Sequence, residues 1–199
     1  MSLLATIRSV GETLGLWKRH VEPVGCTLGR TVYRETKRAA YIANVHRRSR
    51  PLSSNTIVRL RPLFPDVDLE RVRVRERCRL PANRFHESGS TYAMTFGHTI
   101  FFRDDLDEDT PRDLVHVIHE LVHVDQVVRK GGESAFACAY GEGYLSGGGQ
   151  LPEYLQDRGA YHHNPLEAEA YSFEAQFRDA AGRVVDDSLP RVPGHGPPA

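Results

Sequence analysis

The sequence has no long apolar run and no compact apolar segment near its N-terminus. No stretch approaches the roughly 18 consecutive apolar residues of a membrane span, so we expect no transmembrane helix. The stretch MSLLATIRSVGETLGLW is interrupted by Arg8 and Glu12, whereas a signal peptide carries its charge before its apolar segment. The sequence therefore predicts a cytoplasmic protein, or one exported without a signal peptide, with no role in a membrane.

Cysteine is also scarce. The three cysteines, Cys26, Cys78 and Cys138, are odd in number and widely spaced. Disulfide frameworks of small secreted domains use even numbers of cysteines, and cysteine-based metal sites use CxxC pairs. Neither pattern is present, so we expect no disulfide framework, no cysteine metal site and, by default, a reducing compartment.

Opposite charges balance to a net charge of zero but are separated along the chain. Residues 1–80 contain 17 Lys or Arg and 7 Asp or Glu, whereas residues 81–199 contain 9 and 19. We expect these charges to pair within one fold or to lie in solvent. Binding of nucleic acid by the basic half is less favoured, because that half lacks interleaved aromatic residues.

The first 60 residues are predicted to form an N-terminal helical segment, residues 1–60. Apolar residues recur at roughly helical spacing over residues 3–20 and again over residues 27–49. Pro23 and Gly25 predict a turn between these two helices.

A small sheet is predicted next. From Leu69 to Leu80 the stretch LERVRVRERCRL alternates apolar and arginine side chains, which indicates a half-buried strand. Its arginine face is expected to be solvated, and on an edge strand such charge discourages unwanted pairing. Two β-rich runs, Tyr92–Phe96 and Thr99–Arg103, are joined by the dipeptide GH, which predicts a hairpin.

The best-defined helix follows Thr110. Thr110 can cap the free amides, and Pro111 at the first helical position costs no hydrogen bond. Lys130 and then Gly131 close the helix with a cation and a glycine. A second helix is predicted at about residues 166–180. These elements predict an α+β fold with a small, mostly antiparallel sheet and two long helices.

The stretch between the two helices is rich in Gly and Tyr. Residues Gly141 to Gly149 are predicted to form either a mobile flap over a cleft or a plain surface loop. We place the main domain at residues 61–182 and a disordered tail at residues 183–199, where Pro and Gly gather toward the end.

The capped helix contains HELVH, residues 119–123, an HExxH pattern. Residues four apart on a helix differ by about 40° in direction, so His119 and His123 project from one face. Two imidazoles suit zinc, which keeps one position for water, and Glu120 is placed to take a proton from that water. The alternative is that His119 and His123 only hydrogen-bond locally. His116, one turn earlier, either supports the site or has a structural role, and we expect the structural role.

Two histidines leave a zinc site short of a ligand, and the predicted helix at residues 166–180 is the obvious source of a third. Glu167 and Glu169 both qualify, and helical periodicity does not choose between them. Gln126, one turn after the second histidine, either hydrogen-bonds behind the site or lies in solvent.

HELVH followed about forty residues later by LEAEAYSFEA resembles the layout of the glutamate zincins, in which a Glu on a second helix completes an HExxH site. There the ligand is typically the first Glu of a stretch resembling E-x-x-x-D/N/Y. The resemblance implies a zincin-like fold in which Glu167, rather than Glu169, joins His119 and His123 on one Zn²⁺ ion. Tyr171 stands in the last place of that stretch.

A second resemblance covers about residues 66–130. The strand pattern A-x-T-x-G-x-x-I at residues 93–100 precedes the helix pattern HELxHxxQ, and V-R-V lies upstream at residues 72–74. Together they resemble the metallopeptidase domain associated with extracellular contractile injection systems. Asp125 departs from this pattern, because relatives tend to carry an apolar residue before Gln126.

These resemblances imply a zinc metalloendopeptidase with a peptide or protein substrate, and a protein partner in a secretion or injection context. Glu120 would act as base and then as acid toward the leaving amine. Tyr171 and His163 are the first candidates for stabilising the transition state, followed by Tyr161 and His162.

Three further expectations concern the binding of substrate and the alternative functions. The strand ending near Ile100 is expected to offer a free edge to an extended peptide. A catalytically weak zincin domain that serves as a docking or cargo module is the main alternative function. A nucleic-acid-associated regulator that binds through the arginine face of residues 71–79 is a less favoured one.

Overall fold

The computed structural model describes residues 17–80, 92–146, 163–179, 183–185 and 189. Within them the fold is α+β, as predicted, and none of the helices is both long and apolar enough to span a membrane. Its elements are α2 (Trp17–Ala43), β1 (Ser49–Pro51), α3 (Ser54–Leu60), a 3₁₀ turn (Leu69–Arg71), β2 (Arg73–Arg75), β3 (Ala93–Phe96), β4 (Thr99–Phe102), α4 (Pro111–Arg129), α5 (Glu133–Ser146) and α7 (Pro165–Ala175).

The four strands form one mixed sheet in the order β1-β2-β4-β3. The β1–β2 and β3–β4 pairs are antiparallel, and the β2–β4 pair is parallel. The predicted hairpin is confirmed as β3–β4, and Gly97 takes φ +60° in its turn, a conformation that glycine adopts without steric cost.

Two predictions about sheet edges are wrong. Ile100 lies on β4, which is paired on both sides, so β4 has no free edge. The arginine-rich β2 is also an inner strand, so its charges do not protect an edge. Among the described strands the edges are β1 and β3, because β4 pairs in parallel with β2 and thereby moves inward.

The strand predicted from Leu69 to Leu80 is shorter than expected. Only Arg73–Arg75 is regular strand, because a 3₁₀ turn precedes it and Arg77 takes φ +54° after it. Burial nevertheless alternates along the segment as predicted. The arginine face is only partly solvated, since the guanidinium of Arg75 lies over an aromatic ring of α2, that of Tyr41, 5.2 Å from its centroid.

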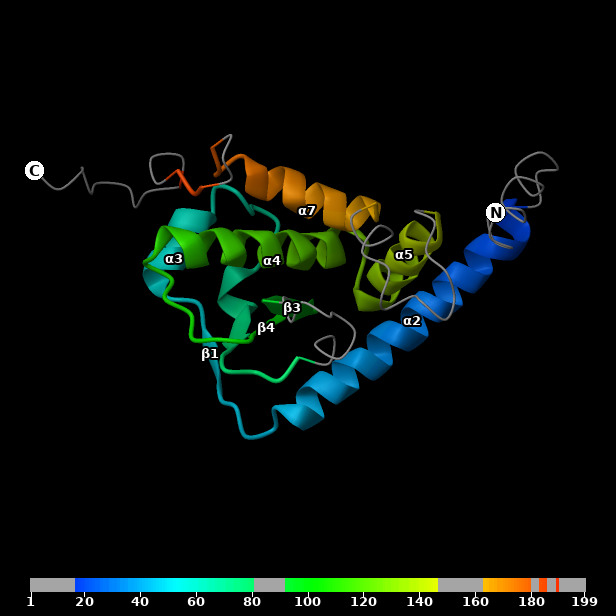
Figure 1. The fold of residues 1–199 in the computed structure, drawn as a ribbon, viewed down its shortest axis with the longest axis horizontal. Coiled ribbons are helices and arrows are strands. Elements are labelled where there is room, and N and C mark those ends of the chain that lie inside the picture. The colour runs from blue at the N-terminus through cyan, green and yellow to red at the C-terminus, as the bar shows by residue number, and fades with distance from the viewer. Residues whose placement is uncertain (1–16, 81–91, 147–162, 180–182, 186–188, 190–199) are drawn as a thin grey trace, which may run out of the picture.

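Helix α4 begins and ends as predicted. The hydroxyl of Thr110 accepts a hydrogen bond from the backbone N–H of Asp113, Pro111 occupies the first turn, and Gly131 takes φ +82° beyond the end. The helix lies between the sheet and α7 (Figure 1). Apolar side chains of all three layers form one core, which includes Val72, Val74, Ile100, Phe102, Leu114, Ile118, Leu121 and Ala170.

Within the described residues, one helix spans the position of the predicted turn. Helix α2 continues through Pro23 and Gly25, where a turn was predicted, and ends at Ala43 rather than at residue 49. The part of the first predicted helix before Trp17 lies outside the described residues. In the structure Gly25 serves close helix packing instead of a turn, because a Cβ there would lie 3.0 Å from the backbone of Glu142.

Helix α5 occupies much of the stretch predicted as a flap or loop. Gly141 is inside this helix, and residues 147–149 lie outside the described residues. Gly141 has a packing role, because a Cβ on it would lie 2.2 Å from the carbonyl oxygen of Gly25. The absence of side chains at these glycines allows α5 to lie directly against α2 (Figure 1).

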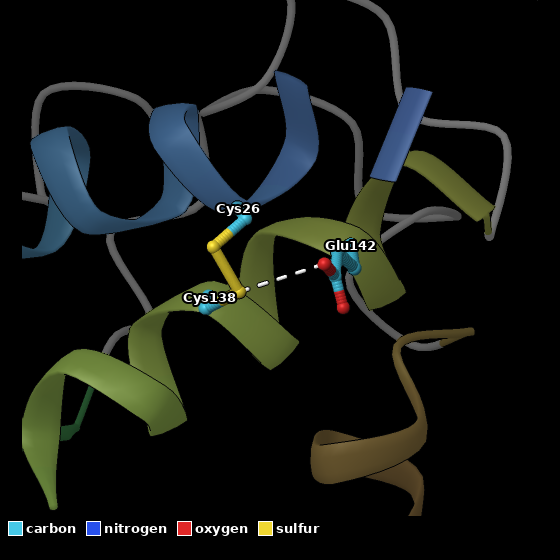
Figure 2. Close-up of side chains that lie close together, drawn as sticks. All are labelled: Cys26, Cys138 and Glu142. Carbon is cyan, nitrogen blue, oxygen red and sulfur yellow. Dashed lines mark hydrogen bonds between the residues drawn. A yellow bond between two sulfur atoms is a disulfide. The ribbon is translucent and has the colours of Figure 1, made fainter. Parts of the chain in front are cut away.

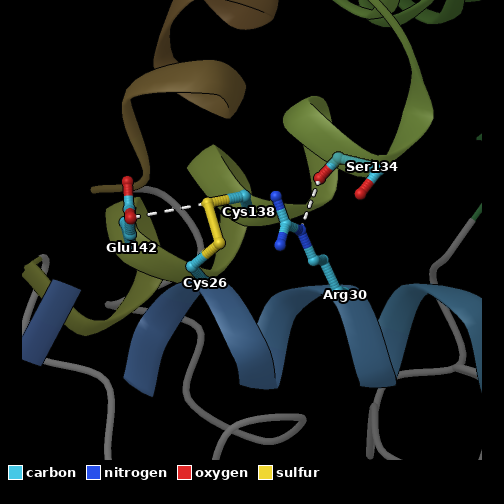
Figure 3. The surroundings of a disulfide bond; sticks show 5 residues. All are labelled: Cys26, Arg30, Ser134, Cys138 and Glu142. Atoms are coloured by element: carbon cyan, nitrogen blue, oxygen red, sulfur yellow. Dashed lines mark hydrogen bonds between the residues drawn. A yellow bond between two sulfur atoms is a disulfide. The ribbon is translucent and has the colours of Figure 1, made fainter. Parts of the chain in front are cut away.

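A disulfide bond joins α2 to α5 through Cys26 and Cys138, which are 112 residues apart in the sequence (Figure 3). The expectation that the cysteines would not form disulfides is therefore wrong for this pair. Cys78 is a free, buried thiol. Cysteine spacing did not reveal the bond, because the close packing of the two helices is what brings these sulfur atoms together.

Opposite charges pair between the basic half (residues 1–80) and the acidic half (residues 81–199), which confirms the expectation of pairing within one fold. Among the described residues, the pairs that span the halves are Lys37–Glu133, Arg50–Glu108 and Arg77–Asp105. The sheet also crosses the predicted boundary at residue 60, because β1 precedes that residue and the other three strands follow it. The division into residues 1–60, 61–182 and 183–199 stays a prediction.

Replacing Gly29 by Ala should destabilise the protein. Alanine normally stabilises a helix interior by about 1 kcal/mol relative to glycine, but here its Cβ would lie 2.1 Å from the carbonyl oxygen of Ala137. We expect the free energy of unfolding to fall by about 1–3 kcal/mol in urea titrations with the disulfide intact. The exposed Thr31→Ala on α2 is the control and should change it by less than about 0.5 kcal/mol. A stabilised G29A variant would contradict the close packing.

Candidate metal centre

Two side chains of HELVH, His119 and His123, lie on the face of α4 that meets α7. His119, Glu120 and His123 are all buried, with exposures of 8%, 7% and 7%. Buried imidazoles and carboxylates are costly unless they are paired or bind a metal, so this cluster requires polar partners.

Glu167, in the first turn of α7, is the carboxylate that faces Nε2 of both imidazoles. Its Oε2 lies 3.5 Å from Nε2 of His123 and 3.9 Å from Nε2 of His119. One ligand atom from each of the three residues lies within 4.8 Å of the other two. Two imidazole nitrogens and one carboxylate oxygen are a donor set that zinc accepts, with a fourth position left for water. The side chains therefore fit a zinc ion.

Glu169 points elsewhere. Its carboxylate accepts hydrogen bonds from Nε2 of Gln126 and from the guanidinium of Arg129 on α4. The choice that periodicity left open is thus decided by position, and Glu167 is the residue that lies beside the histidines. The same contacts account for Asp125, which pairs with Arg129 at 2.6 Å and extends the polar link between the two helices.

Gln126 is buried behind His123 rather than solvated. Its Oε1 lies 2.9 Å from Nδ1 of His123, and its amide also donates to the backbone carbonyl of Leu166. An acceptor on Nδ1 keeps the proton there and directs Nε2 toward Glu167. Gln126 therefore orients one imidazole and anchors the start of α7.

Glu174 performs the same task for His119, and the sequence analysis missed it. Its Oε2 lies 2.9 Å from Nδ1 of His119, while its other oxygen accepts from Arg178 at 2.7 Å. Burial raises the pKa of Glu174, but the hydrogen bonds to His119 and Arg178 outweigh burial and hold that pKa below its usual range. A signal was present in the sequence, since Glu174 follows Glu167 by seven residues, or two helical turns.

Tyr140, on α5, was also missed. Its hydroxyl donates to Oε1 of Glu167 at 2.9 Å, on the oxygen opposite to the one that faces the histidines. This contact was not expected, because no helix was predicted over residues 133–146.

Glu120 is held by the sheet. Its Oε2 accepts a hydrogen bond of 2.6 Å from the hydroxyl of Thr95 on β3. Because β3 is an edge of the described sheet, this carboxylate lies between the candidate metal ligands and an edge strand.

The metal-free centre binds a proton. Burial lowers the pKa of His123, but the carboxylates of Glu167 and Glu120 outweigh burial and raise this pKa to about 9. A metal ion that binds at neutral pH must therefore displace that proton, so its apparent affinity falls as the pH decreases below 9.

The remaining candidates differ in position. His116 stacks on Tyr92, with ring centroids 4.2 Å apart, which agrees with the structural role expected for it. Tyr171 lies against His119, with ring centroids 4.8 Å apart, and is 39% exposed. His163 is exposed in the turn before α7. Tyr161 and His162 lie outside the described residues.

Comparison with known proteins gives one result. Residues 51–131 match the eCIS core domain. The match supports an association of this chain with extracellular contractile injection systems. No curated protein and no solved structure matches the chain significantly. The eCIS core match includes His119, Glu120 and His123 but ends before Glu167.

Replacing Glu167 by Gln should remove most of the affinity for zinc. The loss should exceed the roughly 10- to 100-fold that follows removal of an outer hydrogen-bond partner, because a charged ligand is lost. The measurement is competition for Zn²⁺ with a chromophoric chelator. Glu169→Gln is the matched control and should change affinity by less than about threefold, since that side chain is in a solvent-exposed ion pair. Equal effects of the two substitutions would contradict the assignment.

Glu174→Gln should weaken zinc binding by about 10- to 100-fold while leaving the fold intact. The amide keeps the shape of the side chain but removes the charge that orients His119. Zn²⁺ titration and circular dichroism together separate the two effects. Unchanged zinc affinity would show that the contact between Glu174 and His119 is only structural.

Proposed function

We propose that this protein is a zinc-dependent peptidase. The observation that carries the proposal is the convergence of His119, His123 and Glu167 in the protein interior, with Glu120 beside them. The association with contractile injection systems supplies the context in which a protein substrate or partner would be met.

A bound zinc ion supplies Lewis-acid chemistry, because it polarises a carbonyl and lowers the pKa of water toward neutrality. Glu120 is the residue placed to take the proton of that water. The hydroxyl of Thr95 fixes the orientation of its carboxylate, so the proton is received on a defined group. Glu120 then returns the proton to the amine that leaves when the peptide bond breaks.

The edge strand β3 is the best-placed surface for an extended peptide. Among the described strands β3 pairs only with β4, and its Thr95 touches Glu120. A peptide added alongside β3 would satisfy the backbone hydrogen bonds of both chains and pass close to this carboxylate. This assignment replaces β4, whose two sides are already paired.

Tyr171 is the stronger of the two candidates for stabilising the transition state. Its ring lies against His119 and the residue is 39% exposed, so this side chain is at the border between the candidate site and solvent. A phenol there can donate to the oxygen that becomes negative. His163 is also exposed but lies in the turn that precedes α7.

A docking or cargo module is the second candidate function. It is favoured by one observation, namely that the eCIS core match covers the sheet and α4 but ends before Glu167. In this case the ion would stabilise the fold without hydrolysis. Binding of nucleic acid has no such observation in its favour, and several basic side chains are paired with carboxylates.

Replacing Glu120 by Gln distinguishes peptidase from docking module. The amide cannot accept the proton, so we expect cleavage of an unstructured peptide library to fall by about 10²–10⁴-fold while zinc content stays unchanged. Products are identified by mass spectrometry and metal by elemental analysis. His123→Ala is the companion variant and should lose both zinc and cleavage. A zinc-loaded wild type that cleaves no peptide would favour the docking module instead.

A further inference from the structure

Helix α5 connects a disulfide to the metal centre within three residues. Cys138 is bonded to Cys26 of α2, and Tyr140, two residues later, donates its hydroxyl to Oε1 of Glu167. The candidate ligand Glu167 therefore accepts a hydrogen bond from a helix that is covalently attached to α2 (Figure 3).

The same helix also fixes the start of α7. The side-chain amide of Asn164 donates to the backbone carbonyl of Tyr140 at 3.0 Å, and its Oδ1 accepts from the backbone N–H of Leu166 at 3.0 Å. Asn164 therefore caps the N-terminus of α7 and, with the same side chain, hydrogen-bonds to α5. A displacement of α5 would move both the hydroxyl on Glu167 and the first turn that carries this residue.

The position of α5 is set mainly by α2. Gly29 and Gly141 let the two backbones touch, and Arg30 donates an exposed hydrogen bond to the carbonyl of Ser134 at 3.2 Å (Figure 3). At the start of α5, Glu133 also accepts hydrogen bonds from the hydroxyl of Tyr33 at 2.9 Å and from the ammonium of Lys37 at 2.6 Å. Glycine contacts bury little side-chain surface, and exposed polar contacts contribute little free energy. The disulfide links the two helices covalently and lies two residues from Tyr140, whereas Glu133 and Ser134 lie at the start of α5.

We propose that the Cys26–Cys138 pair is a thiol–disulfide clamp that controls the zinc affinity of the centre by holding Tyr140 against Glu167. This inference rests on the proposed zinc site. In the oxidised state α5 is fixed and Glu167 is oriented. In the reduced state α5 is free to shift from α2 and the hydrogen bond to Glu167 weakens. Tyr140 acts as a positioning residue.

The redox step has a simple balance. A small dithiol supplies two electrons and two protons, the bond between the sulfur atoms breaks to give two thiols, and the dithiol becomes a cyclic disulfide. The carboxylate of Glu142, whose Oε1 lies 3.5 Å from Sγ of Cys138, can accept a hydrogen bond from the thiol formed there (Figure 2). Because disulfides persist in oxidising compartments, the centre would bind zinc most tightly outside a reducing cytoplasm.

The test compares zinc affinity in the oxidised and reduced protein. The dithiol is removed by anaerobic gel filtration before titration, so that it does not compete for the metal. We expect reduction to weaken Zn²⁺ binding about tenfold, as loss of an outer partner does. Oxidised Tyr140→Phe should show a similar loss, and reducing that variant should add less than about twofold, because coupled residues are not additive.

Two cysteine variants serve as controls. Cys26→Ser removes the disulfide without reductant and should match the reduced wild type. Cys78→Ser keeps the disulfide and removes the buried free thiol, so it should match the oxidised wild type and respond to the dithiol in the same way. In the metal-free protein, amide hydrogen exchange in α5 and the first turn of α7 should become faster on reduction.

Several results would overturn the clamp. Equal zinc affinity in both redox states would do so, as would a full additional loss on reducing Tyr140→Phe. Uptake of a second zinc by the reduced protein would show that Cys26 and Cys138 bind metal with Glu142, whose ligand atoms lie within 4.8 Å of theirs. If no form bound zinc, the proposed function itself would fail, an outcome distinct from equal binding.

Discussion

The burial of a carboxylate between two imidazoles is the constraint on which the rest of this structure depends. Glu167 and the two histidines of α4 are removed from water where α4 packs against α7. An isolated charge in that position costs several kcal/mol, so the cluster is stable only with a shared proton or a bound cation. The core on either side of α4 then fixes where these side chains meet.

Each polar group at the centre is held by a different element. Gln126 of α4 and Glu174 of α7 orient the imidazoles, Tyr140 of α5 orients Glu167, and Thr95 of β3 orients Glu120. Such outer contacts fix the direction and basicity of metal ligands. Because they come from four elements, the chemistry of the site depends on the packing of the whole fold, including α2 through its disulfide to α5.

Local signals predicted what local chemistry decides. The cap at Thr110, the glycine at position 131 and the apolar spacing between them gave the bounds of α4, and four-residue spacing placed the two histidines on one face. The β3–β4 hairpin followed from its turn residues. Two predictions based on glycine were wrong, the turn at Gly25 and the flap or loop that begins at Gly141. Glycine permits a turn, but it also permits two helices to pack closely.

The sequence by itself determined the α+β class and the HExxH helix with its two histidines on one face, since these depend on residues within a few turns of each other. Only the tertiary structure decided that Glu167 rather than Glu169 faces the histidines, that Glu174 and Tyr140 support the centre, and that Cys26 meets Cys138. Such contacts join residues tens of positions apart. Their partners are selected by how the helices pack, and no spacing along the chain records that choice.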